Sequence, residues 1–285
     1  MANYKKISGQ AVKCYDSDPP TASPSVWEGQ LYYNTGDGQF KYQTLGVGSW
    51  SSGGTKNTII NDGTGSGSNT AGLAFGGVAP PGITADTETY NGTAWTEVNN
   101  LNAGRRSLTG TGSQTASLAI AGGEAGSFTA ATEKWDGTNW TEVNDLSLGR
   151  SAVGMSGASN TSALVFGGGL PGAPPTPNTE LWNGSNWTEV NNLNTSRRDL
   201  GGGGTATAAL GFCGNPPDTT GVTELWNGTN WTETTDLSTQ RRDASGGGTT
   251  SSGIIMSGYT GTAATATSEE WTGPGAIQTK TFTDS

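Results

Sequence analysis

Short apolar stretches alternate with polar, Gly-rich loops along most of this chain, and the pattern repeats about every 45 residues. Two examples are Ser-Leu-Ala-Ile-Ala (117–121) and Ser-Ala-Leu-Val-Phe (162–166). Apolar runs this short, bounded by turn residues, predict buried β-strands. A pair of small residues follows each run, at Gly76-Gly77, Gly122-Gly123, Gly167-Gly168, Cys213-Gly214 and Ser257-Gly258.

A second signature follows after a loop of variable length: a Glu, an aromatic residue two positions later, Asn-Gly or Asp-Gly, and then a Trp. The Glu residues are Glu88, Glu133, Glu180, Glu224 and Glu269, and the later Trp residues are Trp95, Trp140, Trp187 and Trp231. Asn-Gly between aromatics predicts a tight hairpin, because both central positions of a type I′ turn need a positive φ. Two inner strands plus this outer hairpin give four strands per repeat, which is typical of a β-propeller blade.

The number of blades follows from counting the strands. Inner strands and the Glu-bearing strand occur five times, but Ala276 stands where the fifth outer hairpin needs its Trp. Trp50, near the front of the domain, is in register to supply it. We therefore predict an all-β fold with a five-bladed propeller over residues 46–285. We expect a strand near Trp50 to close the ring by pairing outside residues 267–272, which removes exposed sheet edges.

The repeat resembles the kelch motif, in which Gly-Gly follows an apolar strand and is itself followed by Glu-x-Trp, a second Trp and Arg. The likeness extends over about 240 of the 285 residues. It departs from a standard kelch unit in its richness in Gly and Thr, in its short strands, and in Cys213 and Ser257 replacing Gly.

Two further likenesses point to bacteriophages. The many copies of Asn-Gly-Thr-Asn-Trp-Thr-Glu resemble kelch-like propellers of phage structural proteins, and residues 29–42 are similar to a hairpin near the start of phage fibre and virion proteins. The resemblance implies a non-enzymatic structural protein located in the virion, as a fibre tip, a capsid decoration or a tail-associated protein.

Residues 1–45 lie outside the repeat. They contain a linker at 16–25, rich in Pro, Ser and Asp, and a hairpin expected at 31–34 and 39–43. The segment is interpreted either as a tail with an extra strand pair or as an arm that docks the propeller onto other virion proteins. The candidate docking residues are its aromatics Tyr4, Trp27, Tyr32, Tyr33, Phe40 and Tyr42.

All seven arginines occupy one position of the repeat: Arg105, Arg106, Arg150, Arg197, Arg198, Arg241 and Arg242. As a partner-binding face they would offer guanidinium groups to acidic glycans or to carboxylates of a neighbouring subunit. As scaffold they would bond carbonyls or a Glu of the next blade. Their repetition in every interior unit favours the scaffold interpretation, because a binding site need not repeat with the fold.

Composition narrows the chemistry. The formal charge of −10 disfavours nucleic acid, which needs a cationic surface, and no apolar run is long enough to span a membrane. Histidine is absent, which excludes Ser-His-Asp catalysis and His-ligated metals. The carboxylates occupy repeated, symmetric positions, and no two of them stand out as a catalytic pair. We therefore expect that the protein is not an enzyme and binds no cofactor or metal.

Some questions stay open at this level. The alternative function is a carbohydrate-binding, adhesive propeller that recognises host surface glycans; only Phe128 and Tyr259 supply aromatics on the variable loops, which counts against it. The sequence does not decide the oligomeric state or whether the closing strand comes from the same chain. Cys14 and Cys213 are isolated and form no disulfide framework.

Overall fold

The computed structural model describes residues 13–15, 31–36, 38–42, 52–124, 127–216 and 218–274. Contacts divide the chain into two units, Met1–Ser52 and Gly53–Ser285, whereas the sequence analysis placed the boundary between residues 45 and 46. The regular secondary structure of the described residues consists of β-strands. The described residues contain no helix that is long and apolar enough to cross a membrane.

The described part of the first unit is one small sheet. It consists of β1 (Lys13–Tyr15), β2 (Leu31–Asn34) and β3 (Gln39–Tyr42), with β1 parallel to β2 and β3 antiparallel to it. The β2–β3 pair occupies the expected hairpin, so it carries Tyr32, Tyr33, Phe40 and Tyr42 of the candidate docking residues. Tyr4 and Trp27 lie outside the described residues.

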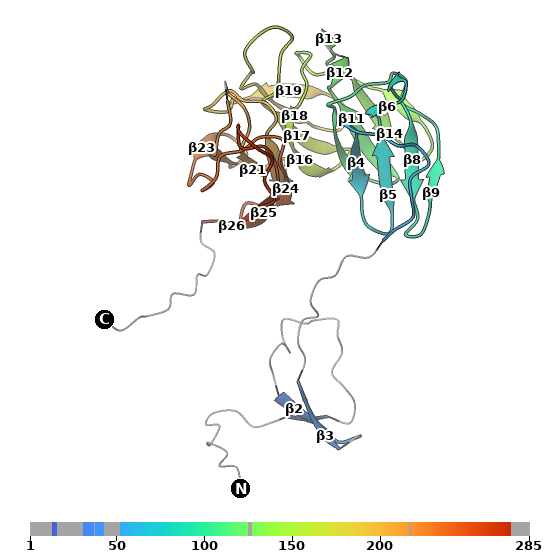
Figure 1. The fold of residues 1–285 in the computed structure, drawn as a ribbon, viewed down its shortest axis with the longest axis vertical. Helices are drawn as coiled ribbons and strands as arrows, with labels where there is room; N and C mark the ends of the chain where they lie inside the picture. Colours follow the sequence, from blue (N-terminus) through green and yellow to red (C-terminus); the bar gives the residue numbers. More distant parts are fainter. Residues whose placement is uncertain are drawn as a thin grey trace, which may run out of the picture. The chain divides into compact units, whose positions relative to one another are not determined.

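The second unit consists of five antiparallel sheets, which confirms the five-bladed propeller (Figure 1). Blade 1 is β4 (Thr64–Gly67), β5 (Gly72–Phe75), β8 (Thr87–Tyr90) and β9 (Trp95–Glu97); blade 2 is β10 (Thr109–Ser113), β11 (Ala116–Ile120), β14 (Thr132–Trp135) and β15 (Trp140–Glu142); blade 3 is β16 (Gly154–Ser159), β17 (Ser162–Phe166), β18 (Thr179–Trp182) and β19 (Trp187–Val190). Each blade pairs its strands in this order, and the innermost strand of each blade lies beside that of the next.

The remaining blades continue the same order. Blade 4 is β20 (Gly201–Thr205), β21 (Ala208–Phe212), β22 (Thr223–Trp226) and β23 (Trp231–Glu233); blade 5 is β24 (Ser245–Gly248), β25 (Ser252–Met256) and β26 (Ser268–Thr272). Two short ribbons, β6 (Val78–Ala79) with β7 (Gly82–Ile83) and β12 (Gly123–Glu124) with β13 (Ser127–Phe128), extend the loops of blades 1 and 2. Trp50, the expected source of the closing strand, lies outside the described residues.

The outer hairpins are present, but their turn is not the two-residue type I′ turn expected from Asn-Gly. Tyr90 pairs with Trp95, so four residues form the loop, and only its Gly has a positive φ, 91° at Gly92. The Asn91 side chain closes the loop, because its Oδ1 accepts the backbone N–H groups of Thr93 and Ala94 at 2.9 Å each. This is an Asx turn, in which a side-chain oxygen replaces a backbone acceptor.

The pair of small residues after the inner strands is shifted by one position in blade 2. Ala121-Gly122, not Gly122-Gly123, matches Gly76-Gly77, because the N–H of Gly122 donates to Arg150 O just as that of Gly77 donates to Arg105 O, both at 2.9 Å. The first position of the pair has a positive φ even with a side chain, 59° at Ala121.

The core lies between blades, where a Trp from the outer strand of one blade packs on the preceding blade. Trp140 meets Phe75 edge to face at 4.8 Å between ring centroids, and Trp231 meets Phe166 at 4.7 Å. The indole N–H groups also cross the boundary: that of Trp140 donates to Thr87 Oγ1 at 3.1 Å. The repeated Trp residues therefore connect successive blades as well as pairing across each hairpin.

Candidate functional site

The repeated arginines separate into two groups in the structure. The first group is buried and ion-paired with the repeated Glu residues: Arg105–Glu133 at 2.7 Å, Arg150–Glu180 at 2.8 Å, Arg197–Glu224 at 3.0 Å and Arg241–Glu269 at 2.5 Å. These four Arg side chains are at most 2% exposed. Their guanidinium groups are therefore not accessible to a binding partner. Of the candidate partner-binding arginines, Arg106, Arg198 and Arg242 remain.

Each buried Arg contacts two blades. The carbonyl of Arg150 accepts the N–H of Gly122 in blade 2, while its guanidinium donates to Glu180, to Gly167 O and to Asn178 O in blade 3. Burial lowers the pKa of Arg150, whereas the charge of Glu180 raises it; a guanidinium nevertheless remains charged in proteins. The same contacts recur around Arg197, which joins blade 3 to blade 4.

The Glu of each pair also holds the incoming chain. Oε2 of Glu133 accepts the N–H of Asn102 at 2.8 Å, and Oε2 of Glu224 accepts that of Asn194 at 2.8 Å. In blade 1 a Lys replaces the Arg: Lys56 Nζ lies 2.8 Å from Glu88 Oε1. The repeated carboxylates are therefore engaged in fixing the path from one blade to the next.

Acid is expected to destabilise the propeller through Glu88. Burial raises the pKa of this carboxyl. Hydrogen bonds from Lys56 and from the backbone N–H groups of Asn57 and Thr58 together lower the pKa by more than burial raises it, so the net pKa lies below the ordinary value. A depressed folded-state pKa gives stability that is present above the unfolded-state pKa and lost as the pH falls through the folded-state pKa.

The measurement is the urea midpoint between pH 7 and pH 3, for the wild type and for Glu88→Gln. The wild-type midpoint is expected to fall steadily below about pH 4.5. The variant starts lower at pH 7 and shows a shallower pH dependence. Parallel pH profiles of the two proteins would contradict the assignment to Glu88.

The second group of arginines lines the centre of one face. Arg106, Arg198 and Arg242 have side chains 39%, 45% and 32% exposed. They border a cavity of about 410 Å³ contributed by blades 2 to 5. Its lining residues are Arg106, Ser107, Gly123, Phe128, Ser151, Ala152, Arg198, Asp199 and Arg242. We call this cavity the central mouth.

Carboxylates accompany these cations. Arg106 lies 4.0 Å from Asp62, Arg198 3.4 Å from Asp199, and Arg242 3.3 Å from Asp243. Burial, together with the charge of Asp243, raises the pKa of Asp199, although Arg198 and Arg242 oppose the shift. The guanidinium of Arg242 also lies over the ring of Tyr259, 4.9 Å from its centroid.

The three aspartates belong to a ring of residues with positive φ. Asp62, Ser107, Ala152, Asp199 and Asp243 have φ of 49° to 55°, and each backbone N–H after the first donates to the carbonyl of its predecessor at 3.0 to 3.2 Å. The sequence analysis did not single out these aspartates as candidate site residues. Their place beside the arginines was missed, because nothing in the spacing indicates which side chains face the central axis.

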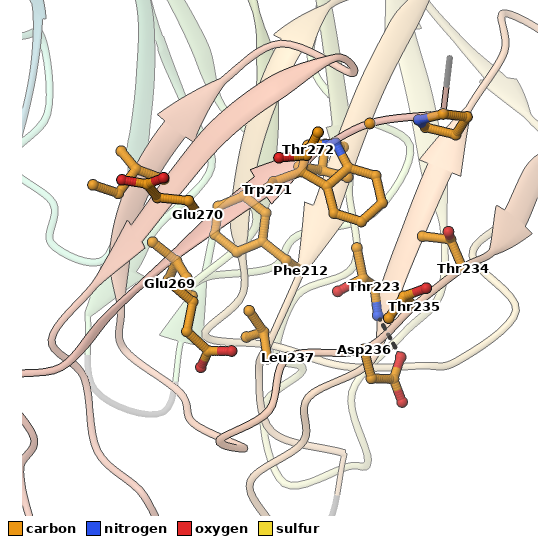
Figure 2. Close-up of a pocket in the computed structure, with 15 residues that line it drawn as sticks. Phe212, Thr223, Thr234, Thr235, Asp236, Leu237, Glu269, Glu270, Trp271 and Thr272 are labelled. Carbon is orange, nitrogen blue, oxygen red and sulfur yellow. Dashed lines mark hydrogen bonds between the residues drawn. The ribbon is translucent and has the colours of Figure 1, made fainter. Parts of the chain in front are cut away.

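A groove forms a second cavity, of about 480 Å³, between blade 4 and the outer edge of blade 5 (Figure 2). Phe212, Leu237 and Trp271 supply apolar surface, and Thr223 lies nearby with its N–H donating to Asp236 Oδ1 at 3.1 Å. We call this the blade 5 groove. Neither cavity holds a cluster of metal-ligating residues, since the described part of the chain contains none.

Cys213 is expected to be inert in the folded protein. Its thiol is buried, and burial raises its pKa to about 11. Because the thiolate is the reactive form, a thiol reagent at pH 8 should label Cys213 only on unfolding. Cys14→Ser provides the background in which this thiol is titrated alone with and without urea; rapid labelling without urea would contradict the burial.

Of the comparisons with known proteins, the one with solved structures supports the propeller fold. No family model matches the chain, and no curated protein matches it. Among solved structures, one titled "Structure of YjhT" aligns with a TM-score of 0.64 over 81% of this chain and 84% of that one, at 12% sequence identity. The likeness is one of fold alone.

Proposed function

We propose that this protein is a non-enzymatic structural component of a bacteriophage virion, which displays a kelch-like propeller and docks to other virion proteins through its N-terminal segment. The observation that carries the proposal is that the repeated charged side chains form ion pairs within the propeller scaffold. The four buried Arg–Glu pairs hold one blade to the next, and Lys56–Glu88 holds the segment that leads into blade 1. Charged side chains that are engaged in structural ion pairs support an architectural role.

The division of the chain supports the docking part of the proposal. The propeller begins at Gly53, and the preceding unit has a sheet of its own with the aromatic-rich strands β2 and β3. A separate, small sheet ahead of a propeller suits an attachment segment. The resemblance of residues 29–42 to a phage fibre hairpin points the same way.

Quantitative mass spectrometry of purified phage particles and of the infected cells tests the proposal. Stoichiometric copies in the particle are expected, and their number would separate a capsid decoration from a tail appendage. If the protein is found only in cell extract or medium, the structural proposal fails.

A second candidate function, binding of acidic glycans on a host surface, is favoured by the central mouth. Three half-exposed guanidinium groups and Phe128 converge on a cavity of about 410 Å³, which has the size of a small-ligand site. Guanidinium groups recognise carboxylates through paired hydrogen bonds. The aspartates beside them would have to exchange partners on binding.

Glycan arrays with matched acidic and neutral sugars test this candidate. Binding of acidic sugars only, lost in Arg106→Ala/Arg198→Ala/Arg242→Ala, is the expected result. These side chains are exposed, so the triple variant should keep the wild-type melting temperature within a few degrees. Equal binding by the triple variant would remove the mouth from consideration.

A further inference from the structure

The tips of the four outer hairpins differ from one another in a single chemical group. Three of them carry the Asn-Gly pairs of the sequence, Asn91-Gly92, Asn183-Gly184 and Asn227-Gly228. The hairpin of blade 2 carries Asp136-Gly137 at the same position, between the two aromatic residues that pair across the hairpin. All four Asn and Asp residues are exposed. The same loop is therefore built with a side-chain amide in three blades and with a carboxylate in one.

The amide and the carboxylate make the same contacts within the loop. Oδ1 of Asn227 accepts the backbone N–H groups two and three positions further along the chain, at 2.9 Å each. Oδ1 of Asp136 accepts the equivalent N–H groups at 2.8 and 2.7 Å. The glycine that follows has a positive φ in both loops, 94° at Gly228 and 97° at Gly137. An aspartate thus closes this turn as an asparagine does.

The contact between each loop and the preceding blade is also the same. The side-chain amide of Asn99 in blade 1 donates to Thr138 O, in the loop that carries Asp136, at 3.0 Å. The side-chain amide of Asn191 in blade 3 donates to Thr229 O, in a loop that carries asparagine, at the same distance. A carboxylate at the tip therefore leaves the contact between blades in place.

The loop also places an asparagine side chain next to a free backbone nitrogen. Among the described residues, none accepts a hydrogen bond from the N–H of Gly92, Gly184 or Gly228. The Asn91 side chain folds back over the peptide that contains the Gly92 nitrogen, because its Oδ1 reaches the two N–H groups beyond it. Backbone N–H groups that point at an oxygen stabilise the negative charge that develops on it during attack at its carbon.

We propose that Asn91, Asn183 and Asn227 are modification sites, at which the side-chain amide is converted to a carboxylate while the hairpin keeps its fold. The nitrogen of the following Gly forms a bond to Cγ, the bond from Cγ to Nδ2 breaks, and Nδ2 leaves as ammonia together with the proton of the Gly N–H. Water then opens the cyclic imide, adding its hydroxyl to Cγ and returning a proton to the Gly nitrogen. Each conversion adds one negative charge to the surface.

Asp136 shows why the product accumulates. Hydrogen bonds from the backbone N–H groups of Asn139 and Thr138 lower the pKa of Asp136 below its ordinary value. The carboxyl is therefore ionised at neutral pH, and an ionised carboxylate is a poor electrophile for the glycine nitrogen. An aspartate formed at the other three tips gains the same two hydrogen bonds, so it is protected from cyclising again.

Peptide mapping by mass spectrometry tests the modification on the purified full-length protein, aged in warm, mildly alkaline buffer. The mass gain of an amide converted to an acid should appear at the three tips several-fold faster than at Asn69. Asn69 is the internal control, because it is exposed but is followed by Thr70, whose branched side chain hinders the attacking nitrogen. A mass gain at the tips that is no faster than at Asn69 would overturn the proposal.

Two triple variants test whether the product keeps the fold. Asn91→Asp/Asn183→Asp/Asn227→Asp should melt within about 2 °C of the wild type. Alanine at the same three positions removes the acceptor of both N–H groups and should lower the melting temperature by about 5–10 °C. An Asp variant that melts as low as the Ala variant would contradict the proposal. Both measurements use the isolated protein, so their outcome is independent of whether the protein is found in virions.

Discussion

Arg197→Ala is expected to lower the free energy of unfolding by about 3–5 kcal/mol, because it leaves the carboxylate of Glu224 buried without its charge partner. Both side chains are fully buried. The guanidinium also donates to the carbonyls of Cys213 and Val222, which lose that donor as well. Urea denaturation followed by circular dichroism measures the loss.

The adjacent residue provides the matched control. Arg198 has the same type of side chain one position further along, but it is 45% exposed, so its ion pair with Asp199, which is 16% exposed, is open to solvent on the Arg side. Exposed ion pairs contribute about 0–1 kcal/mol. Arg198→Ala should therefore change the free energy of unfolding by less than about 1 kcal/mol, and equal effects of the two variants would contradict the division of the arginines into buried and exposed groups.

Trp231→Ala should have an effect of similar size, about 3–5 kcal/mol, typical of removing a buried Trp. The ring is 5% exposed, packs on Phe166 of the preceding blade and donates to Thr179. The substitution removes this aromatic contact between blades 3 and 4 together with the indole hydrogen bond to Thr179. The free energy of unfolding is again obtained from urea denaturation.

Two further variants separate the contributions. Trp231→Phe keeps an aromatic ring against Phe166 and removes the N–H donor to Thr179, so its cost should be smaller than that of Trp231→Ala. Thr229→Ala, at the exposed tip of the same hairpin, should stay within about 0.5 kcal/mol of wild type. If the Phe variant is as unstable as the Ala variant, the stacking contact contributes little.

The repeat was enough to predict the blades, because its spacing counts strands directly. The turn chemistry was not predictable from the dipeptide alone: Asn-Gly is shared by two-residue turns and by the four-residue Asx loop, and the position of the paired aromatics decides between them. The register in blade 2 was missed because the sequence contains Gly122-Gly123 one position further along, whereas the structure uses Ala121-Gly122 with Ala121 at a positive φ.

The division of the arginines had a signal in the sequence that went unused. Arg105, Arg150, Arg197 and Arg241 recur in all four interior units, whereas the following position changes from Arg to Ser at Ser151. A residue that the scaffold requires recurs in every unit, and one that faces solvent does not have to. The blade 5 groove had an indirect signal in the sequence, because Ala276 stands where the fifth outer hairpin needs its Trp. Its lining was not predicted, since it combines strands and a loop from two blades.

The placement of the buried arginines at the junctions has a consequence for how the domain comes apart. In many repeat proteins, stability is a sum of unit and interface terms, and single units open independently. Here the residue that begins each new blade is bonded by its backbone to the blade before and by its side chain to the blade after. If one blade unfolded alone, a buried charged side chain in the adjacent blade would lose its ion-pair partner. We therefore expect the propeller to unfold in a single cooperative transition.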